Sequence, residues 1–541
     1  MAELSWPKFY ILESLYEQRI DLAHVSNRRA LSFTTRGDIY FTAAEISEFP
    51  KFRVFVFINP DNSICDPDAT PRDHPDQGKT VTFYFEKIHK HSYFLPISAM
   101  LLTIFSPVIA FMGVNIHNAM KAKRRTLSVE NPANEDVLIH FGSPGVVNEG
   151  QLINVTGDSH EQAEVDQVQV EENSVTPVQD SLSIHAEMLK YPIAIILPVF
   201  MHTAVEYIKW STSSMANRDE MCFHNHACSQ PYGEIRAINN IVSNAGYFFF
   251  GVLFIVITMV RRKGMMVLHH ISGVYECTLI DVTIGIFMMM QAVASGVYHI
   301  CPSDVAFQFD TPFIQVICGL LIIRQWSIRK ESPSAAYSNF LLVAIVILNF
   351  SISALSKSPN IRIFLAITHL LVVAAVCAAK RHDILEIPVD SHQKKHSIIF
   401  CALFAGINGI LMVLYAIIGA FHLNQISTYC FVVNCAFYLM YYTVIKKIHH
   451  EKLSMAAKMA GILAIVSWIF ALSFFFQDGT DWTKSAAQSR SLNKPCVLLN
   501  FFGSHDMWHI GGAFASLFTF IYVSYVDDDI RHVHKLNINI F

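Results

Sequence analysis

The sequence contains few charged residues for its length. Asp, Glu, Lys and Arg make up 16% of its 541 residues, whereas a soluble globular protein normally carries about 25%. The composition is instead 52% hydrophobic and 12% aromatic, and the mean hydropathy is +0.35. Many apolar runs reach roughly 20 residues, the length that crosses a bilayer as a helix. We therefore predict a polytopic α-helical membrane protein.

The sequence also has no excess of Lys and Arg over Asp and Glu. It contains no Cys-x-x-Cys pair and no recognisable secretory signal peptide. The net charge of −4 gives no reason to expect a nucleic-acid partner from composition alone. The first twenty residues are mixed in polarity and have no continuous apolar core, unlike a signal peptide. We expect either that the first apolar run acts as a reverse signal anchor or that the N-terminus is an incomplete gene model or an alternative start.

Residues 1–92 are predicted to form an extracellular segment that contains part of a β-rich domain. Short stretches of alternating polarity, such as 29–34 and 52–58, are separated by turn-forming Asn, Pro, Asp and Gly, a pattern typical of strands. About four strands are too few to close a sandwich. The basic residues are interspersed with acidic ones and indicate solvated strand edges, so no RNA-binding residue is identified.

Eleven apolar runs predict about eleven transmembrane helices. The first is expected at 93–115, followed by a disordered cytosolic loop at 116–188 and a ten-helix transmembrane domain at 189–541. Every second connection is basic, so the positive-inside rule places the N-terminus outside and the C-terminus in the cytosol. The ten later runs lie near 190–207, 237–260, 277–298, 305–325, 337–355, 362–379, 397–421, 428–446, 457–477 and 505–527.

Three histidines and an aspartate are predicted to meet in the outer leaflet. His505 and His509 are four residues apart at the start of the last run, so they share a helix face. The predicted topology places His299 and Asp310 at a membrane depth similar to that of His505 and His509. This donor set suits zinc. Asp310 is expected either as the fourth ligand or, together with Ser295, as the group that holds a water molecule for hydrolysis.

Two simpler interpretations of these residues stay open. Paired histidines near a membrane interface are often solvated or bonded to a backbone carbonyl, and Asp310 alone would mark the aqueous boundary. Asp506 is expected to point away from the face of His505 and His509, and to be a helix-start residue favoured by the helix dipole.

Four cysteines on the predicted outer side are candidates for disulfides: Cys222, Cys228, Cys301 and Cys496. They form an even set in an oxidising compartment, so two disulfides that tie loops over the site are expected. Their pairing stays open. The stretch 222–228, which also contains two histidines, fits a metal-binding loop as well, but disulfides are favoured on an external face.

The motifs of this sequence resemble those of the systemic RNA interference defective transmembrane family, and in particular its nematode double-stranded-RNA channel. The similarity covers about residue 27 to the end, which makes the expected ectodomain N-terminally truncated. The family belongs to a superfamily of seven-helix metal hydrolases that includes alkaline ceramidases and the progestin/adiponectin receptors. The matching stretches are Ser295-x-x-x-His299, Phe307–Asp310, Ser504–His509, Met221–Cys228, Tyr298–Pro302, Val526–Ile530 and Ile538–Phe541.

The resemblance implies a channel that imports double-stranded RNA in systemic RNA interference. It implies a homodimer in the plasma membrane, with an RNA-binding ectodomain and with zinc held by His299, His505 and His509, and Asp310 and Ser295 completing the site. Endosomal or lysosomal membranes are the alternative location. Two other functions stay open: a zinc-dependent hydrolase of ceramides, sphingolipids or phospholipids, with Ser295 and Asp310 as catalytic residues, and cholesterol binding or uptake.

Overall fold

The described part of the chain is helical and membrane-spanning. Eight of its helices are long and apolar enough to cross a membrane, and the named elements in these residues include no strand. The predicted fold class, a polytopic α-helical membrane protein, is confirmed. The predicted β-rich segment 1–92 lies outside the described residues. The computed structural model describes residues 93–129, 222–233, 235–265, 274, 277–329, 359–386, 391–418, 423–477, 480, 486–531, 533 and 538.

Nine of the eleven predicted apolar runs are helices, and the runs 190–207 and 337–355 lie outside the described residues. The elements are α2 (Phe94–Val129), α5 (Ile238–Val242), α6 (Ala245–Met265), α7 (Thr278–Tyr298), α8 (Asp304–Ser327), α10 (Pro359–Glu386), α11 (Ser391–Val413), the π-helical turn η4 (Leu414–Ile418), α12 (Leu423–Ile448), α13 (Met455–Phe475), α14 (Ala486–Ser489), η5 (Arg490–Leu492), α15 (Ser504–Tyr525) and η6 (Asp528–Ile530).

Two elements differ from the predicted boundaries. The run 237–260 is not one helix, because a turn at Ser243 and Asn244 separates α5 from α6. Helix α2 continues beyond the predicted end at 115 to Val129, so the beginning of the predicted loop 116–188 is helical, and the rest of that loop lies outside the described residues. The chain divides into two compact units, 105–181 and the remainder, so α2 belongs to both.

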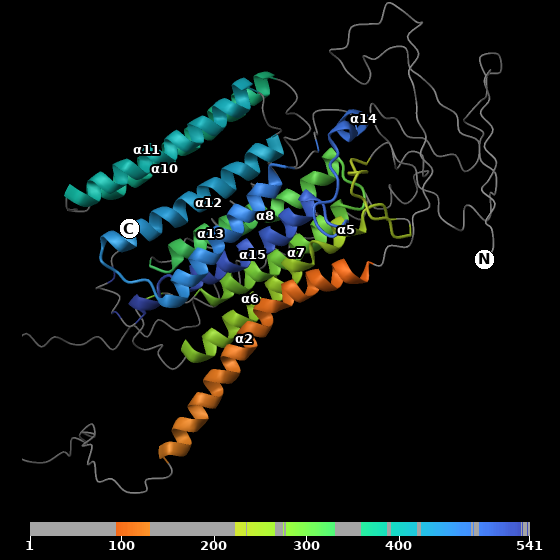
Figure 1. The fold of residues 1–541 in the computed structure, drawn as a ribbon. Coiled ribbons are helices and arrows are strands. Elements are labelled where there is room, and N and C mark those ends of the chain that lie inside the picture. Colours follow the sequence, from red (N-terminus) through yellow and green to blue (C-terminus); the bar gives the residue numbers. More distant parts are fainter. Residues whose placement is uncertain are drawn as a thin grey trace, which may run out of the picture. The chain divides into compact units, whose positions relative to one another are not determined.

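Helices α13 and α15 pack along much of their length, and Figure 1 shows them side by side. A Cβ added at Gly511 of α15 would lie 3.2 Å from the Cα of Ala471 in α13. Small residues let two membrane helices approach closely. The buried residues of α13 are all alanines: Ala457, Ala460, Ala464 and Ala471.

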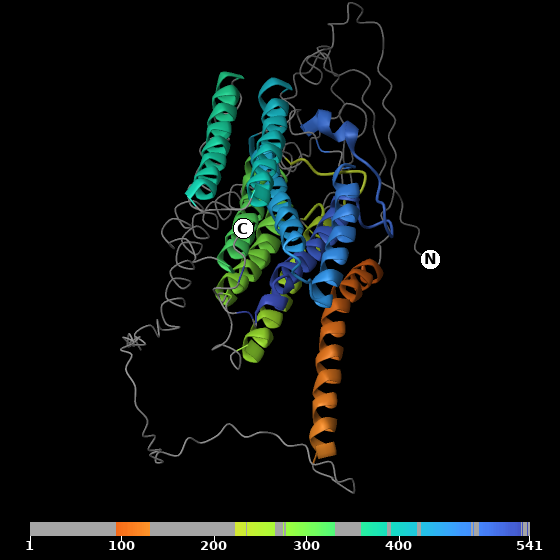
Figure 2. The ribbon, with the colours of Figure 1, turned by 90° about the vertical axis from the view of Figure 1, so that its left-hand side faces the viewer.

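Helices α6 and α7 also pack at close range. A Cβ added at Gly251 of α6 would lie 2.7 Å from the carbonyl oxygen of Gly285 in α7, so neither position has room for a side chain unless the helices separate. Helix α7 contacts α8, and α8 contacts α12. Helices α10 and α11 form a pair, with α11 next to α12 (Figure 1, Figure 2).

A buried charged cluster joins the C-terminal ends of α8, α12 and α15. Asp527, which is 1% exposed, accepts hydrogen bonds from Arg329 Nη2 at 2.6 Å, Tyr442 Oη at 2.6 Å and Lys446 Nζ at 3.4 Å. Glu451 pairs with both Arg329 and Lys446. Because charges taken out of water are stable only when paired and hydrogen-bonded, the cluster holds these three helix ends together.

Lys446 belongs to one of the basic connections that the sequence places in the cytosol. Helix α12 continues to Ile448, and the side chain of Lys446 is fully buried among Glu451, Asp527 and Asp529. These three carboxylates make its burial possible.

The pairing of Glu451 predicts how stability depends on pH. Burial raises the pKa of Glu451, but hydrogen bonds from Arg329 and Lys446 and their charges outweigh burial and lower it to about 2. A carboxyl whose folded-state pKa is depressed stabilises the protein above its unfolded-state pKa, and this contribution is lost as pH falls through the folded-state value. Between about pH 7 and 5, the stability difference between the wild type and Glu451→Gln should therefore be constant, and it should shrink from about pH 4.5 toward 2. Thermal unfolding of the purified protein over this pH series checks this, and a difference already lost near pH 6 would contradict it.

Candidate metal centre

Three histidine side chains meet at one side of the bundle, where α7 ends and where α8 and α15 begin. The ring centroids of His299 and His505 are 4.9 Å apart, those of His299 and His509 are 4.9 Å apart, and those of His505 and His509 are 4.5 Å apart. One nitrogen of each ring lies within 4.8 Å of the others. The structure thus brings together residues that are about two hundred positions apart in the chain.

The start of α15 sets the position of His505 and His509. Asp506 Oδ2 accepts a hydrogen bond from the backbone N–H of Gly503 at 2.8 Å, and a second one from Asn239 Nδ2 at 2.8 Å. These bonds satisfy a free N–H group at the helix start and tie α15 to α5. Asp506 is thus the helix-start residue that the sequence predicted.

Ser243 orients His509 by contacting the ring nitrogen that does not face His299. Its hydroxyl lies 2.9 Å from His509 Nδ1, which leaves Nε2 of the same ring directed toward His299. Partners of this kind fix the tautomer and the orientation of a ligating imidazole. The sequence does not point to Ser243, because the run 237–260 predicts one uninterrupted helix; the polar pair Ser243-Asn244 inside that run is the available signal.

His299 follows the last residue of α7 and faces His509. Their Nε2 atoms are 3.4 Å apart, and His299 is buried. Burial lowers the pKa of His299 well below its usual range, and His509 and His505 lower it further. A neutral imidazole is the form that binds a metal ion.

Asp310 and Ser295 lie beside this cluster. Asp310 Oδ1 accepts a hydrogen bond from Gln291 Nε2 at 2.5 Å, and Ser295 is a second hydrogen-bond partner of Asp310. Asp310 is close enough for its charge to act on His505, but it is not among the donor atoms that lie within 4.8 Å of one another. Asp310 therefore stays a predicted ligand or water holder, and Gln291 is a partner that the sequence did not suggest.

The four candidate cysteines form two disulfides that converge on one segment. Cys222 is bonded to Cys301, two residues after His299, and Cys228 is bonded to Cys496, in the connection that leads to His505. Backbone contacts follow the same path, as in the hydrogen bond from Phe223 N to the carbonyl oxygen of Pro302 at 2.7 Å. Segment 222–230 thus ties together the two parts of the chain that carry the histidines.

Comparison with known proteins identifies the family. The family profile described as "dsRNA-gated channel SID-1" matches residues 10–541. The chain belongs to this SID-1 family. The resemblance found in the sequence motifs is confirmed, and two of those motifs, Ser295-x-x-x-His299 and Ser504–His509, supply the three clustered histidines.

Curated relatives in the SID-1 family are distant and longer. Cholesterol uptake protein 1 of Caenorhabditis elegans is 27% identical over 409 residues, which cover 68% of this chain and 52% of that protein. SID1 transmembrane family member 1 of Homo sapiens is 26% identical over 359 residues, 61% of this chain and 43% of that protein. The Rattus norvegicus protein of the same name is 26% identical over 364 residues, 61% and 44% of the two chains. The chain spans about half the length of the curated relatives it matches.

The donor set of this SID-1 family member fits a zinc ion. With Zn–N bonds of about 2.0–2.1 Å, two nitrogens of a tetrahedral site are about 3.3–3.4 Å apart, and the Nε2 atoms of His299 and His509 are 3.4 Å apart. Neutral imidazole nitrogens are ligands that zinc prefers, and three of them lie within 4.8 Å of one another here.

Proposed function

We propose that this protein imports double-stranded RNA across the membrane. The observation that carries the proposal is the match of residues 10–541 to the dsRNA-gated channel SID-1 family. The multi-pass helical fold supports it, because passage of a polyanion through a bilayer requires a protein path. RNA binding would depend on neutralising phosphates, and the residues that do this are not identified.

The proposal includes an orientation and an assembly. The N-terminus is outside and the C-terminus is in the cytosol, as the alternation of basic connections predicts. Both disulfides then lie on the oxidising side of the membrane, in agreement with the usual location of such bonds. A homodimer in the plasma membrane is the proposed assembly, carried over from the family resemblance.

Zinc held by His299, His505 and His509 is proposed as a structural part of this protein. A zinc ion bound there would supply positive charge and fixed tetrahedral geometry to the site. The residues around it support this role: Ser243 orients His509, Asp506 fixes the start of α15, and the two disulfides hold the loops.

Uptake of labelled duplex RNA by cells that lack the pathway tests the proposal. Three proteins are compared at equal surface expression: this chain, the same chain joined to the N-terminal region of a curated relative, and the double variant His505→Ala/His509→Ala. Import by either of the first two supports transport. If neither imports RNA although both reach the cell surface, the proposal is wrong.

A zinc-dependent lipid hydrolase is the second candidate, favoured by the contacts of Asp310. Its hydrogen bonds with Ser295 and Gln291 beside the histidines place a carboxyl where it could take a proton from a reacting water. Bound zinc would supply Lewis acidity, and Ser295 would hold the substrate oxygen. Release of fatty acid from a ceramide or phospholipid by the purified protein, lost in Asp310→Asn, is the corresponding assay.

Cholesterol binding is a third candidate. A cavity of about 330 Å³ between α2, α13 and α15 is lined mostly by apolar side chains, among them Met100, Phe470 and Phe514. A relative is named cholesterol uptake protein 1. Photo-crosslinking with a sterol probe would place label in this cavity if the candidate is correct.

A further inference from the structure

Two polar groups without partners lie together at one end of helices α10 and α11. The hydroxyl of Tyr415, in the π-helical turn η4, and the Nε of Arg362, in the first turn of α10, are buried and find no hydrogen-bond partner in the described part of the chain. Arg362 lies one helical turn before Ala366, which belongs to the same packed cluster as the Tyr415 ring. A buried donor without a partner is unfavourable, so a group that accepts from both is expected.

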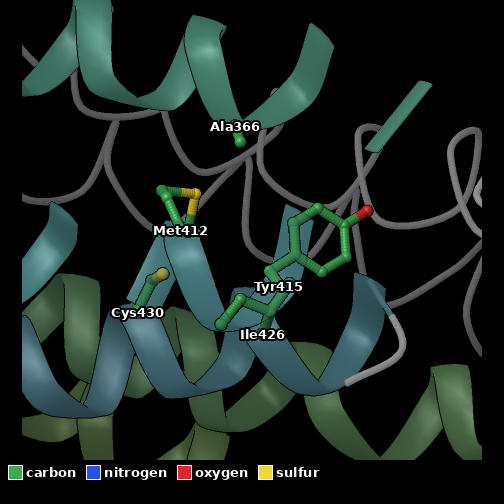
Figure 3. Packing of buried hydrophobic residues seen from close by; sticks show 5 residues of the cluster. All are labelled: Ala366, Met412, Tyr415, Ile426 and Cys430. Atoms are coloured by element: carbon green, nitrogen blue, oxygen red, sulfur yellow. The ribbon is translucent and has the colours of Figure 1, made fainter. Parts of the chain in front are cut away.

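The Tyr415 side chain is buried, and its surroundings fix the ring while its hydroxyl has no hydrogen-bond partner among the described residues. The ring packs with Ala366 of α10, Met412 of α11, and Ile426 and Cys430 of α12. Figure 3 shows the hydroxyl oxygen at the far end of the ring from Met412 and Cys430. The π-helical turn η4, which carries Tyr415, follows α11 directly.

This pair lies on the same side of the membrane as the histidine cluster. The C-terminal ends of α8, α12 and α15 meet at Arg329, Lys446 and Asp527, so the starts of these helices, including His505, lie at the opposite side. Tyr415 packs against Ile426 in the first turns of α12 and therefore belongs to that opposite side. Arg362 and Tyr415 are thus near a membrane–water interface, where lipid headgroups lie.

Apolar side chains continue from this pair along the outer surface of the helices. Phe364 of α10 is 67% exposed, and Ile417 of η4 is 78% exposed. In a membrane protein, such faces contact acyl chains. A donor pair with one positive charge next to an acyl-chain surface matches a phospholipid, whose phosphate oxygens accept hydrogen bonds and carry negative charge.

We propose that Arg362 and Tyr415 form a binding site for the phosphate group of a membrane phospholipid, whose acyl chains lie along α10 and η4. The site is separate from the histidine cluster and does not depend on RNA transport. A sterol offers one neutral hydroxyl, whereas a phosphate also carries negative charge that attracts Arg362, so the charged phosphate is the better match.

Binding of phosphatidylglycerol to the purified full chain tests the site, with native mass spectrometry and thermal unfolding as readouts. We expect adducts and a higher unfolding temperature with phosphatidylglycerol, and neither with diacylglycerol of the same chains nor with inorganic phosphate. Tyr415→Phe should weaken binding about tenfold and Arg362→Gln about a hundredfold, the range for hydrogen bonds to charged groups. The control Tyr441→Phe, on α12 but outside the site, should bind normally.

The Tyr415→Phe variant keeps the proposal separate from a folding defect. It preserves the ring that packs in the cluster and removes only a hydroxyl that has no partner among the described residues, so without lipid it should unfold at the wild-type temperature or above. Wild-type lipid affinity in Tyr415→Phe would overturn the proposal. Equal binding of diacylglycerol, cholesterol or free inorganic phosphate would overturn it as well.

Discussion

Replacing His505 and His509 together by alanine is expected to reduce the zinc content of the purified protein from about one ion per chain to none. The two side chains supply two of the three nitrogens that lie within 4.8 Å of one another. His299 alone cannot hold the ion, because structural sites need about four ligands and catalytic sites about three. Elemental analysis after purification without chelator gives the metal content.

Two further variants test how zinc binding depends on the surroundings of the histidines. Ser243→Ala, which removes the partner of His509 Nδ1, should weaken zinc binding about 10–100-fold, the usual cost of losing such a partner. His450→Ala, at the far end of α12, is the matched control and should retain the metal. Chelator should lower the unfolding temperature of the wild type but not of the double variant, because only a protein that binds the ion is stabilised by it. Full zinc content in the double variant would disprove the site.

Asp527→Ala is expected to destabilise the protein by about 3–5 kcal/mol, the usual cost of removing one partner of a buried ion pair. Arg329 and Lys446 would be left buried, each with one carboxylate partner fewer. The hydrogen bonds that Tyr442 and Gln325 donate to Asp527 would be lost as well. Unfolding of the purified protein by denaturing detergent measures the change.

The neighbouring residue provides the control for Asp527. Asp528 pairs with Arg261 and Arg531, but its side chain is 24% exposed, whereas that of Asp527 is 0% exposed. Solvent screening limits such a pair to about 0–1 kcal/mol, so Asp528→Ala should have a small effect. Similar losses in the two variants would mean that burial does not decide the strength of these pairs.

The helices and the meeting of the histidines could be predicted from the sequence. Apolar runs of bilayer length become helices whatever their neighbours are, and the four-residue spacing of His505 and His509 fixes a shared helix face. His299 follows from topology, because α7 ends on the side where α15 begins. These inferences need only local pattern and the alternation of basic connections.

The partners of these residues could not be predicted, because they depend on contacts between distant segments. Ser243 faces His509 only since the chain turns between α5 and α6, and nothing in an apolar run fixes such a turn. The pairing of Cys222 with Cys301 and of Cys228 with Cys496 is one of three arrangements open to four cysteines. Lys446 is buried among three carboxylates, two of which, Asp527 and Asp529, come about 80 positions later in the chain.

Transport by the purified protein in vesicles tests the central claim most directly, because no other protein is present. The chain is reconstituted into liposomes, labelled duplex RNA is added outside, and the label that survives external ribonuclease is counted. We predict protected RNA in vesicles that contain the protein, a smaller amount with single-stranded RNA of equal length, and none in empty vesicles. Correctly inserted, zinc-loaded protein that protects no duplex RNA would contradict the claim that this chain forms a path for double-stranded RNA.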